Sequence, residues 1–298
     1  MSAVISPPAE GDVQEAQAAL RDARQALLQG QAIPYLGPGI LQLGAEPSPV
    51  PATAEALVER LVTKATVPHK IRKRLTQAAQ YIENFKHRKT VVTLMNEAFA
   101  ASTTPHPLQL WLATLSLPLI IESWYDDTMS EALRQVLGEA GWGQMQGLSQ
   151  SEHFGTWYAC YDASGQRVSP EQADWPTLLY RPIGGHAPAA NYLVSDADYV
   201  EVLTEIDIQT PIPAAVQERR TGRSFLFLGC RFDDQLTRSF ARQIMKRSSG
   251  RHWVVLPNEP TRMELRFLAE QGITRIAMSL PDALEGLMAD LSHPSSGE

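Results

Sequence analysis

Cysteine and long hydrophobic runs are scarce in this sequence. Only two of its 298 residues are cysteine, Cys160 and Cys230, and they stand 70 positions apart. Two cysteines exclude a four-cysteine zinc ribbon, and their separation gives no reason to expect a disulfide framework. The longest apolar stretch, residues 110–121, is too short to span a bilayer. We therefore expect a chain without a metal centre or a membrane role, in a reducing cytoplasm.

Positive charge is also in short supply. The chain has 26 Lys or Arg against 33 Asp or Glu, which gives a net charge of −7 and an isoelectric point near 5.6. These values argue against a general nucleic-acid binder, although they allow a local basic patch. With 44% apolar residues, the chain is typical of a globular protein with one large domain or two closely joined ones.

One stretch departs from this acidic balance. Residues 64–89 hold eight Lys or Arg and a single acid, Glu83, in the sequence KATVPHKIRKRLTQAAQYIENFKHRK. A patch for nucleic acid or for an acidic partner would have this composition. We interpret the stretch as a solvated helix face, because we identify no aromatic interleaving that would support stacking on bases. Nucleic acid is therefore not an expected partner.

Short apolar runs typical of strands alternate with helical patterns through most of the chain. The runs cover residues 32–36, 117–122, 178–180, 225–228, 253–256 and 273–278. The first run breaks at Gly37-Pro38-Gly39, where a strand of an open parallel sheet would meet a ligand-facing loop. Residues 47–109 have the pattern of a helical insert. Residues 138–176, rich in Gly, Ser, Gln and Trp, are predicted to form an irregular small module.

Four loops in a fixed order resemble those of a known family. They are PYLGPGI, IIESWYDD, LYRPIGG with the following YLVSDADYV, and FLFLGCRFDD with the following HWVVLPNEP. Together they resemble the sirtuin-like family, in particular its zinc-free bacterial branch, whose members often serve as NAD-cleaving modules in antiviral defence. The resemblance runs from about residue 25 to residue 292, and the catalytic motifs within it are degraded.

The resemblance implies an α/β fold with a doubly wound parallel, Rossmann-like sheet and a helical small domain in place of the zinc ribbon. Residues 1–298 would form a single sirtuin-like unit. Its core would comprise residues 12–46, 110–135 and 178–292. NAD or ADP-ribose would lie over the C-terminal ends of the strands, and the loop at residues 37–39 should lie beside Gly229 and Asn258.

The residues that match the family's cofactor-binding loops are Gly37, Pro38, Gly39, Ile40, Trp124, Asp126, Gly229, Cys230, Arg231, Asn258 and Glu259. Pro38 stands where alanine is usual, and it removes one N–H from a loop that binds phosphate through N–H groups. Leu41 replaces a serine hydroxyl. Arg231 replaces a serine, and it would either meet a pyrophosphate or pair with Asp233 or Asp234. Cys230 has no adjacent base in the sequence and is not expected to be reactive.

Two substitutions remove the groups that active relatives use for chemistry. Trp124 stands where an asparagine positions the nicotinamide ribose, and indole offers one donor and no acceptor. Ile183 stands where a histidine acts as general base, and isoleucine accepts no proton. His186 follows three residues later, about 10 Å away along an extended chain. We expect His186 to pin its loop or face solvent, and Asp196 and Asp198 to cap the next helix.

The sequence therefore predicts an inactive sirtuin-like domain that binds NAD, ADP-ribose or a related nucleotide, or else a protein partner or a second copy of itself. The alternative is an NAD glycohydrolase of antiviral defence that would use Asp126 and a displaced His186 as catalytic residues. Fold alone does not decide between these two functions.

Overall fold

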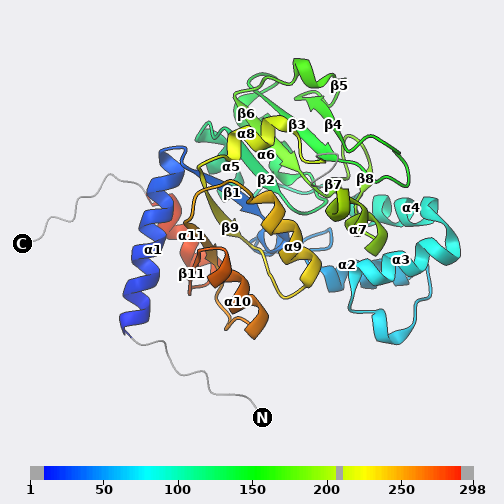
Figure 1. Ribbon diagram of the computed structural model, residues 1–298, viewed down its shortest axis with the longest axis horizontal. Coiled ribbons are helices and arrows are strands. Elements are labelled where there is room, and N and C mark those ends of the chain that lie inside the picture. Colours follow the sequence, from blue (N-terminus) through cyan, green and yellow to red (C-terminus); the bar gives the residue numbers. More distant parts are fainter. Residues whose placement is uncertain (1–9, 206–210, 290–298) are drawn as a thin grey trace, which may run out of the picture.

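The computed structural model describes residues 10–205 and 211–289, so the outermost parts of the predicted unit and residues 206–210 and 290–292 of its predicted core lie outside the described residues. A nine-stranded sheet with helices on both faces organises the chain (Figure 1). Its strand order is β11-β10-β9-β1-β2-β6-β3-β4-β5. The strands are β1 (Ala32–Leu36), β2 (Leu119–Glu122), β3 (Trp142–Gly147), β4 (Tyr158–Asp162), β5 (Arg167–Val168), β6 (Thr177–Arg181), β9 (Ser224–Leu228), β10 (His252–Val255) and β11 (Ile273–Ile276).

The seven strands from β11 to β3 in this order pair in parallel, and β4 and β5 add an antiparallel edge. This mostly parallel sheet confirms the predicted Rossmann-like fold class. Successive side chains of a strand point to opposite faces, and both faces are covered here. In β1, Ile33 and Tyr35 belong to one buried cluster while Ala32 and Leu36 belong to the other.

Each face of the sheet packs against its own set of helices. One face buries residues of α1 (Glu10–Leu28), α5 (Pro107–Thr114), α6 (Thr128–Leu137) and α11 (Leu280–Met288). The other face buries residues of the insert helices described below and of α7 (Asp196–Glu205), α8 (Ala214–Arg220), α9 (Gln235–Ile244) and α10 (Arg262–Glu270). Two hydrophobic layers therefore fix the sheet between them.

The segment predicted to be irregular, residues 138–176, differs from the prediction. It contributes β3, β4 and β5, and β3 lies next to β6 inside the sheet. The sequence of β3, WGQMQG, lacks the apolar run that identifies a buried strand. Its buried glutamines hydrogen-bond instead, since Gln146 Nε2 donates to Gln144 Oε1 at 2.9 Å and to the Ala187 carbonyl at 2.6 Å. Hydrogen bonding replaces the hydrophobic pattern in this strand.

The predicted helical insert is formed by α2 (Ala54–Val62), α3 (Leu75–Lys86) and α4 (Arg88–Phe99), with a short turn, η2 (His69–Ile71), between α2 and α3. Figure 1 shows α3 and α4 in cyan and α2 in blue, at the opposite side of the molecule from α1. Thr53 caps α2, because its hydroxyl accepts a hydrogen bond from the Ala56 N–H at 3.1 Å.

Arg88 ties the insert to the sheet region. Its guanidinium contacts Asp198 at 2.8 Å and Glu83 at 3.3 Å, and it donates to the Tyr192 carbonyl at 2.5 Å. Asp198 Oδ2 also accepts from the Ser195 N–H at 2.9 Å, so this residue has the capping role predicted for it. The insert is thus anchored by a largely buried ion pair.

No helix within the described residues combines the length and the apolar character that a membrane crossing requires.

His252 provides a test of the central packing. It is buried on β10, and its Nδ1 accepts a hydrogen bond from the Phe225 N–H at 2.9 Å. Burial lowers the pKa of His252 to about 4. The unfolded chain therefore binds more protons than the folded chain between pH 6.5 and 4, and stability must fall as pH decreases through this window.

We expect His252→Gln to remove up to about 3 kcal/mol of this pH dependence, because glutamine keeps an acceptor but does not titrate. Urea unfolding of both proteins at pH 7.5, 6, 5 and 4 measures the difference. Parallel stability curves over this range would contradict the neutral state of buried His252.

Candidate functional site

The sheet places the predicted ligand region at the C-terminal ends of its central strands. The chain passes from β1 to β2 on one side, and β9 returns to pair with β1 on the other side. Such a reversal leaves a crevice beyond the strand ends, where doubly wound proteins bind their ligands. The ends of β1, β2, β6, β9 and β10 carry the residues selected from the sequence.

The first glycine loop packs directly on the end of β9. The Gly37 N–H donates to the Leu228 carbonyl at 2.9 Å, and the Gly39 N–H donates to the Gly229 carbonyl at 3.0 Å. A Cβ atom on Gly37 would lie only 2.5 Å from the Gly229 carbonyl oxygen. The predicted neighbourhood of loop 37–39 and Gly229 is therefore confirmed. Glycine is required at position 37 by this close approach.

This packing changes what the first loop can bind. The N–H groups of Gly37 and Gly39 are already bonded to β9, and the Ile40 N–H donates to the Gly37 carbonyl at 3.2 Å. Pro38 has no N–H. Ile40 itself is buried in the short turn η1 (Pro38–Gln42). The backbone donors that would cradle a phosphate in this loop are committed to the protein.

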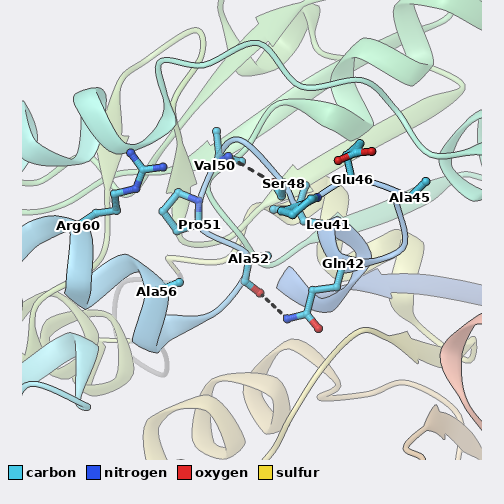
Figure 2. Close-up of a pocket in the computed structure, with 12 residues that line it drawn as sticks. Leu41, Gln42, Ala45, Glu46, Ser48, Val50, Pro51, Ala52, Ala56 and Arg60 are labelled. Carbon is cyan, nitrogen blue, oxygen red and sulfur yellow. Dashed lines mark hydrogen bonds between the residues drawn. The ribbon is translucent and has the colours of Figure 1, made fainter.

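A pocket of about 420 Å³ follows the first loop, between residues 41–52 and α2. Figure 2 shows the side chains of this loop and of α2 around it. Gln42 Nε2 donates to the Ala52 carbonyl and Arg60 Nη2 donates to the Pro49 carbonyl, each at 3.3 Å. Arg60 is the basic residue of the lining, and Glu46 is its acid. The sequence analysis did not identify this pocket, since a proline-rich loop has no pattern that predicts a cavity.

At the end of β2, Trp124 is only 6% exposed. Its indole N–H donates to the Pro51 carbonyl at 2.7 Å, and its ring packs edge-on against Phe99 at a centroid distance of 6.2 Å. The single donor of the indole is thus used to hold the loop that lines the pocket. Trp124 fills space between the strand end and the insert.

Asp126 precedes α6, and its side chain bonds to the first residue of that helix. Its Oδ1 accepts from the Thr128 N–H at 3.0 Å and from the Thr128 hydroxyl at 2.5 Å, and its side chain is buried. Burial raises the pKa of Asp126, although the hydrogen bonds from Thr128 oppose this shift. A carboxylate in this position stabilises the start of the helix.

Ile183 and His186 lie on the glycine turn after β6. Ile183 is 3% exposed within the core. The turn brings His186 back to the end of β2, because the His186 N–H donates to the Tyr125 carbonyl at 2.9 Å. The imidazole Nδ1 contacts Asp127 Oδ2 at 2.9 Å, and the ring stays 30% exposed. His186 therefore pins its loop, as predicted, through an aspartate that the sequence analysis did not select.

Arg181, at the end of β6, lies fully buried beneath this turn. Its guanidinium donates to Asp127 Oδ1 at 2.9 Å and to the Ala187 carbonyl at 2.8 Å, and it also donates to the Asp126 carbonyl. Its Nε lies 3.1 Å from Glu122 Oε2. One side chain thus connects β2, the start of α6 and the glycine turn.

The carboxylates around Arg181 differ in their protonation behaviour. Burial raises the pKa of Asp127, but hydrogen bonds from His186, together with the charge of Arg181, outweigh burial and leave this pKa below its ordinary value. Burial and the nearby Asp126 raise the pKa of Glu122 well above its ordinary value, against the effect of Arg181. Asp127 is therefore the acid that stays ionised beside His186.

Each glycine of the turn, Gly184 and Gly185, has its own structural reason. Gly184 has a φ of +77°, which favours glycine. A Cβ atom on Gly185 would lie 2.2 Å from the Arg181 Cζ atom. The turn therefore needs two glycines because one adopts a left-handed conformation and the other makes room for the buried guanidinium.

The ends of β9 and β10 carry the remaining predicted residues. Cys230 is buried, and burial raises the pKa of its thiol, which fits an unreactive cysteine. Arg231 pairs with the buried Glu264 at 3.3 Å, so the predicted pairing with Asp233 or Asp234 is wrong. Asp234 instead caps α9, where its Oδ1 accepts from the Leu236 N–H at 2.8 Å.

Asn258 and Glu259 follow β10 and are exposed. Glu259 pairs with Arg275 at 3.0 Å, and the same guanidinium donates to the Asn258 carbonyl at 3.1 Å.

Residues 118–276 match the family model described as the SIR2-like domain. This match covers more than half of the chain. The chain belongs to the SIR2-like family. Among curated proteins, none matches it. The matched region includes the ends of β2, β6, β9 and β10, whereas the first glycine loop precedes it.

Three residues of the SIR2-like site region escaped the sequence analysis. Asp127, Arg181 and Glu122 form its charged centre, yet none stands in a position that the family resemblance selects. Two signals pointed to them: the paired aspartates of WYDD, and charged residues at the ends of two buried strands. Charges at such positions are seldom buried unless they are paired.

Arg181→Met should destabilise the SIR2-like domain by about 3–5 kcal/mol, because it leaves buried carboxylates without their partner. Urea unfolding measures the loss. Arg266→Met is the matched control, since Arg266 is 72% exposed and pairs with Glu270 on the same helix. A midpoint for Arg181→Met as close to wild type as that of the control would contradict the central role of Arg181.

Proposed function

We propose that this SIR2-like domain binds NAD, ADP-ribose or a related nucleotide in the cytoplasm without cleaving it. One observation carries the proposal: the positions of the family's general base and ribose-positioning amide hold Ile183 and Trp124, both buried in the core. A protein partner that recognises the same strand ends is the other form that a binding role would take.

Cleavage of the nicotinamide bond needs groups that these two residues do not provide. Isoleucine has no atom that accepts a proton from a ribose hydroxyl. The indole of Trp124 has one N–H donor, and it donates to the Pro51 carbonyl. Neither side chain is therefore available to a substrate.

The adenosine side of the region supports nucleotide binding better. Arg231 is partly exposed, at 46% of its side chain, although it pairs with Glu264. A guanidinium in this position can meet a pyrophosphate while Glu264 orients it. Because the loop N–H groups are committed, we assign phosphate binding to arginine side chains. Arg60 in the neighbouring pocket is the second one.

A second candidate function is NAD glycohydrolysis, in the manner of defence-associated relatives. The contact between His186 Nδ1 and Asp127 Oδ2 favours it, because an aspartate that holds one imidazole nitrogen leaves the other free to act as a base. In this version Asp127, rather than Asp126, would support His186.

A nicotinamide-release assay separates these functions. We expect no nicotinamide above the buffer blank after incubation of the purified chain with NAD, with an active NAD glycohydrolase as positive control. Turnover that disappears in both His186→Ala and Asp127→Asn would establish the glycohydrolase instead.

Calorimetric titration tests the binding role. ADP-ribose should bind at least as tightly as NAD, and nicotinamide should not compete, because the nicotinamide side is filled. Arg231→Ala should weaken ADP-ribose binding about tenfold, the value of one charge-assisted hydrogen bond. Arg266→Ala, on the exposed face of α10, serves as the control. NAD binding much tighter than ADP-ribose binding would require an open nicotinamide pocket and would refute the proposal.

A further inference from the structure

The helical insert carries a surface that neither the fold nor the strand-end site uses. Six exposed cationic side chains lie at the two ends of α3: Lys70, Arg72, Lys73 and Arg74 precede it, Lys86 is its last residue, and Lys89 follows in α4. None of these six forms an ion pair with another residue in the described parts of the chain. Their charge is therefore directed at solvent.

An aromatic pair lies on α3 between these two groups of cations. Phe85 is 69% exposed, and its ring lies 4.4 Å from that of Tyr81 at an interplanar angle of 34°. Residues four positions apart share one face of a helix. Tyr81 packs on the hydrophobic core and supports Phe85 from below. The prediction that residues 64–89 lack interleaved aromatics is wrong.

Charge separates this surface from the rest of the molecule. Residues 64–89 have eight Lys or Arg and one acid, while the remainder has 18 Lys or Arg against 32 Asp or Glu. The one acid, Glu83, is held by Arg88 at 3.3 Å. A polyanion is therefore attracted to the insert and repelled by the body of the domain.

We propose that the outer surface of the helical insert binds single-stranded nucleic acid. Bases stack on the Tyr81–Phe85 pair, and phosphates contact the Lys and Arg residues at both ends of α3. A helix of this length, about 18 Å, suits a short segment of strand at the lower end of the known site sizes, about 4 nucleotides. Stacking requires unpaired bases, so a duplex fits this surface less well than a single strand.

A second exposed aromatic lies on a loop attached to the insert. Phe154 is 95% exposed on the loop between β3 and β4. The same loop is fixed to the insert, because Glu152 contacts Arg88 at 3.2 Å and the Ser151 hydroxyl contacts Glu83 at 3.5 Å. An acidic peptide would use the cations but gives no reason for solvent-facing rings beside them.

Fluorescence anisotropy with the full chain and labelled 20-nucleotide oligo(dT) and oligo(U) at 50 mM salt tests the proposal. We expect binding that weakens steeply with salt. Phe85→Ala should reduce affinity about tenfold, because stacking contributes about 1–3 kcal/mol per base. Phe85→Trp should retain it. Leu265→Ala, which removes an exposed apolar side chain from α10, should leave affinity unchanged.

A charge variant tests the phosphate contacts. Replacing Lys73, Arg74, Lys86 and Lys89 together by alanine should reduce the slope of log affinity against log salt by about 3. Circular dichroism confirms that each variant is folded. The control replaces Arg21 and Arg266, exposed on α1 and α10, by alanine.

Four outcomes overturn the proposal: no oligonucleotide binding at 50 mM salt; equal affinity for a duplex of the same length; wild-type affinity in Phe85→Ala; or unchanged affinity in the charge variant. Displacement of the oligonucleotide by polyglutamate at equal charge, with no effect of Phe85→Ala, would also overturn it and assign the surface to an acidic protein segment.

Discussion

The buried guanidinium of Arg181 is the constraint on which the strand-end region depends. It bonds to the Asp126 carbonyl, to Asp127 and to the Ala187 carbonyl, so three chain segments meet at one charge. In a low-dielectric interior such a charge is costly unless it is paired and hydrogen-bonded. This requirement fixes the glycine turn, and the turn in turn fixes His186. The strand-end region is therefore held together by the hydrogen bonds and ion pairs of Arg181.

A second constraint is the contact between the first glycine loop and the end of β9. Glycines at positions 37 and 39 allow the two backbones to approach, and their N–H groups bond across the contact. In a phosphate-binding loop such donors would point at the ligand. Here they join the ends of β1 and β9 at the point where the strand order of the sheet reverses. The N–H groups of Gly37 and Gly39 are therefore not available to an anion at this edge.

The insert adds a surface that is independent of the strand ends. It is anchored by the buried pair of Arg88 and Asp198, so its position does not require an occupied nucleotide site. The Trp124 indole links the two regions through the Pro51 carbonyl, on the loop that leads into α2. The strand-end region and the outer surface of the insert are therefore two separate parts of this SIR2-like domain.

The sequence by itself determined the fold class, the positions of β1, β2, β6, β9, β10 and β11, and the contact of Gly37 with Gly229. Apolar runs and glycine breaks are local signals, and parallel strands necessarily end at the same edge. Local patterns also identified the insert and the capping role of Asp198. They failed for β3, because buried glutamines that bond to each other leave no hydrophobic pattern.

Only the tertiary structure decided the pairing of charges. His186 was three residues from its expected site along the chain, yet the turn returned it to Asp127 at the end of β2. Arg231 found Glu264, which lies 33 positions away, rather than its neighbouring aspartates. The rings of Phe85 and Tyr81 meet at the surface instead of in the core, and this depended on which face of α3 packs inward. Which residues distant in sequence form a pair depends on geometry and burial. Both are properties of the folded chain.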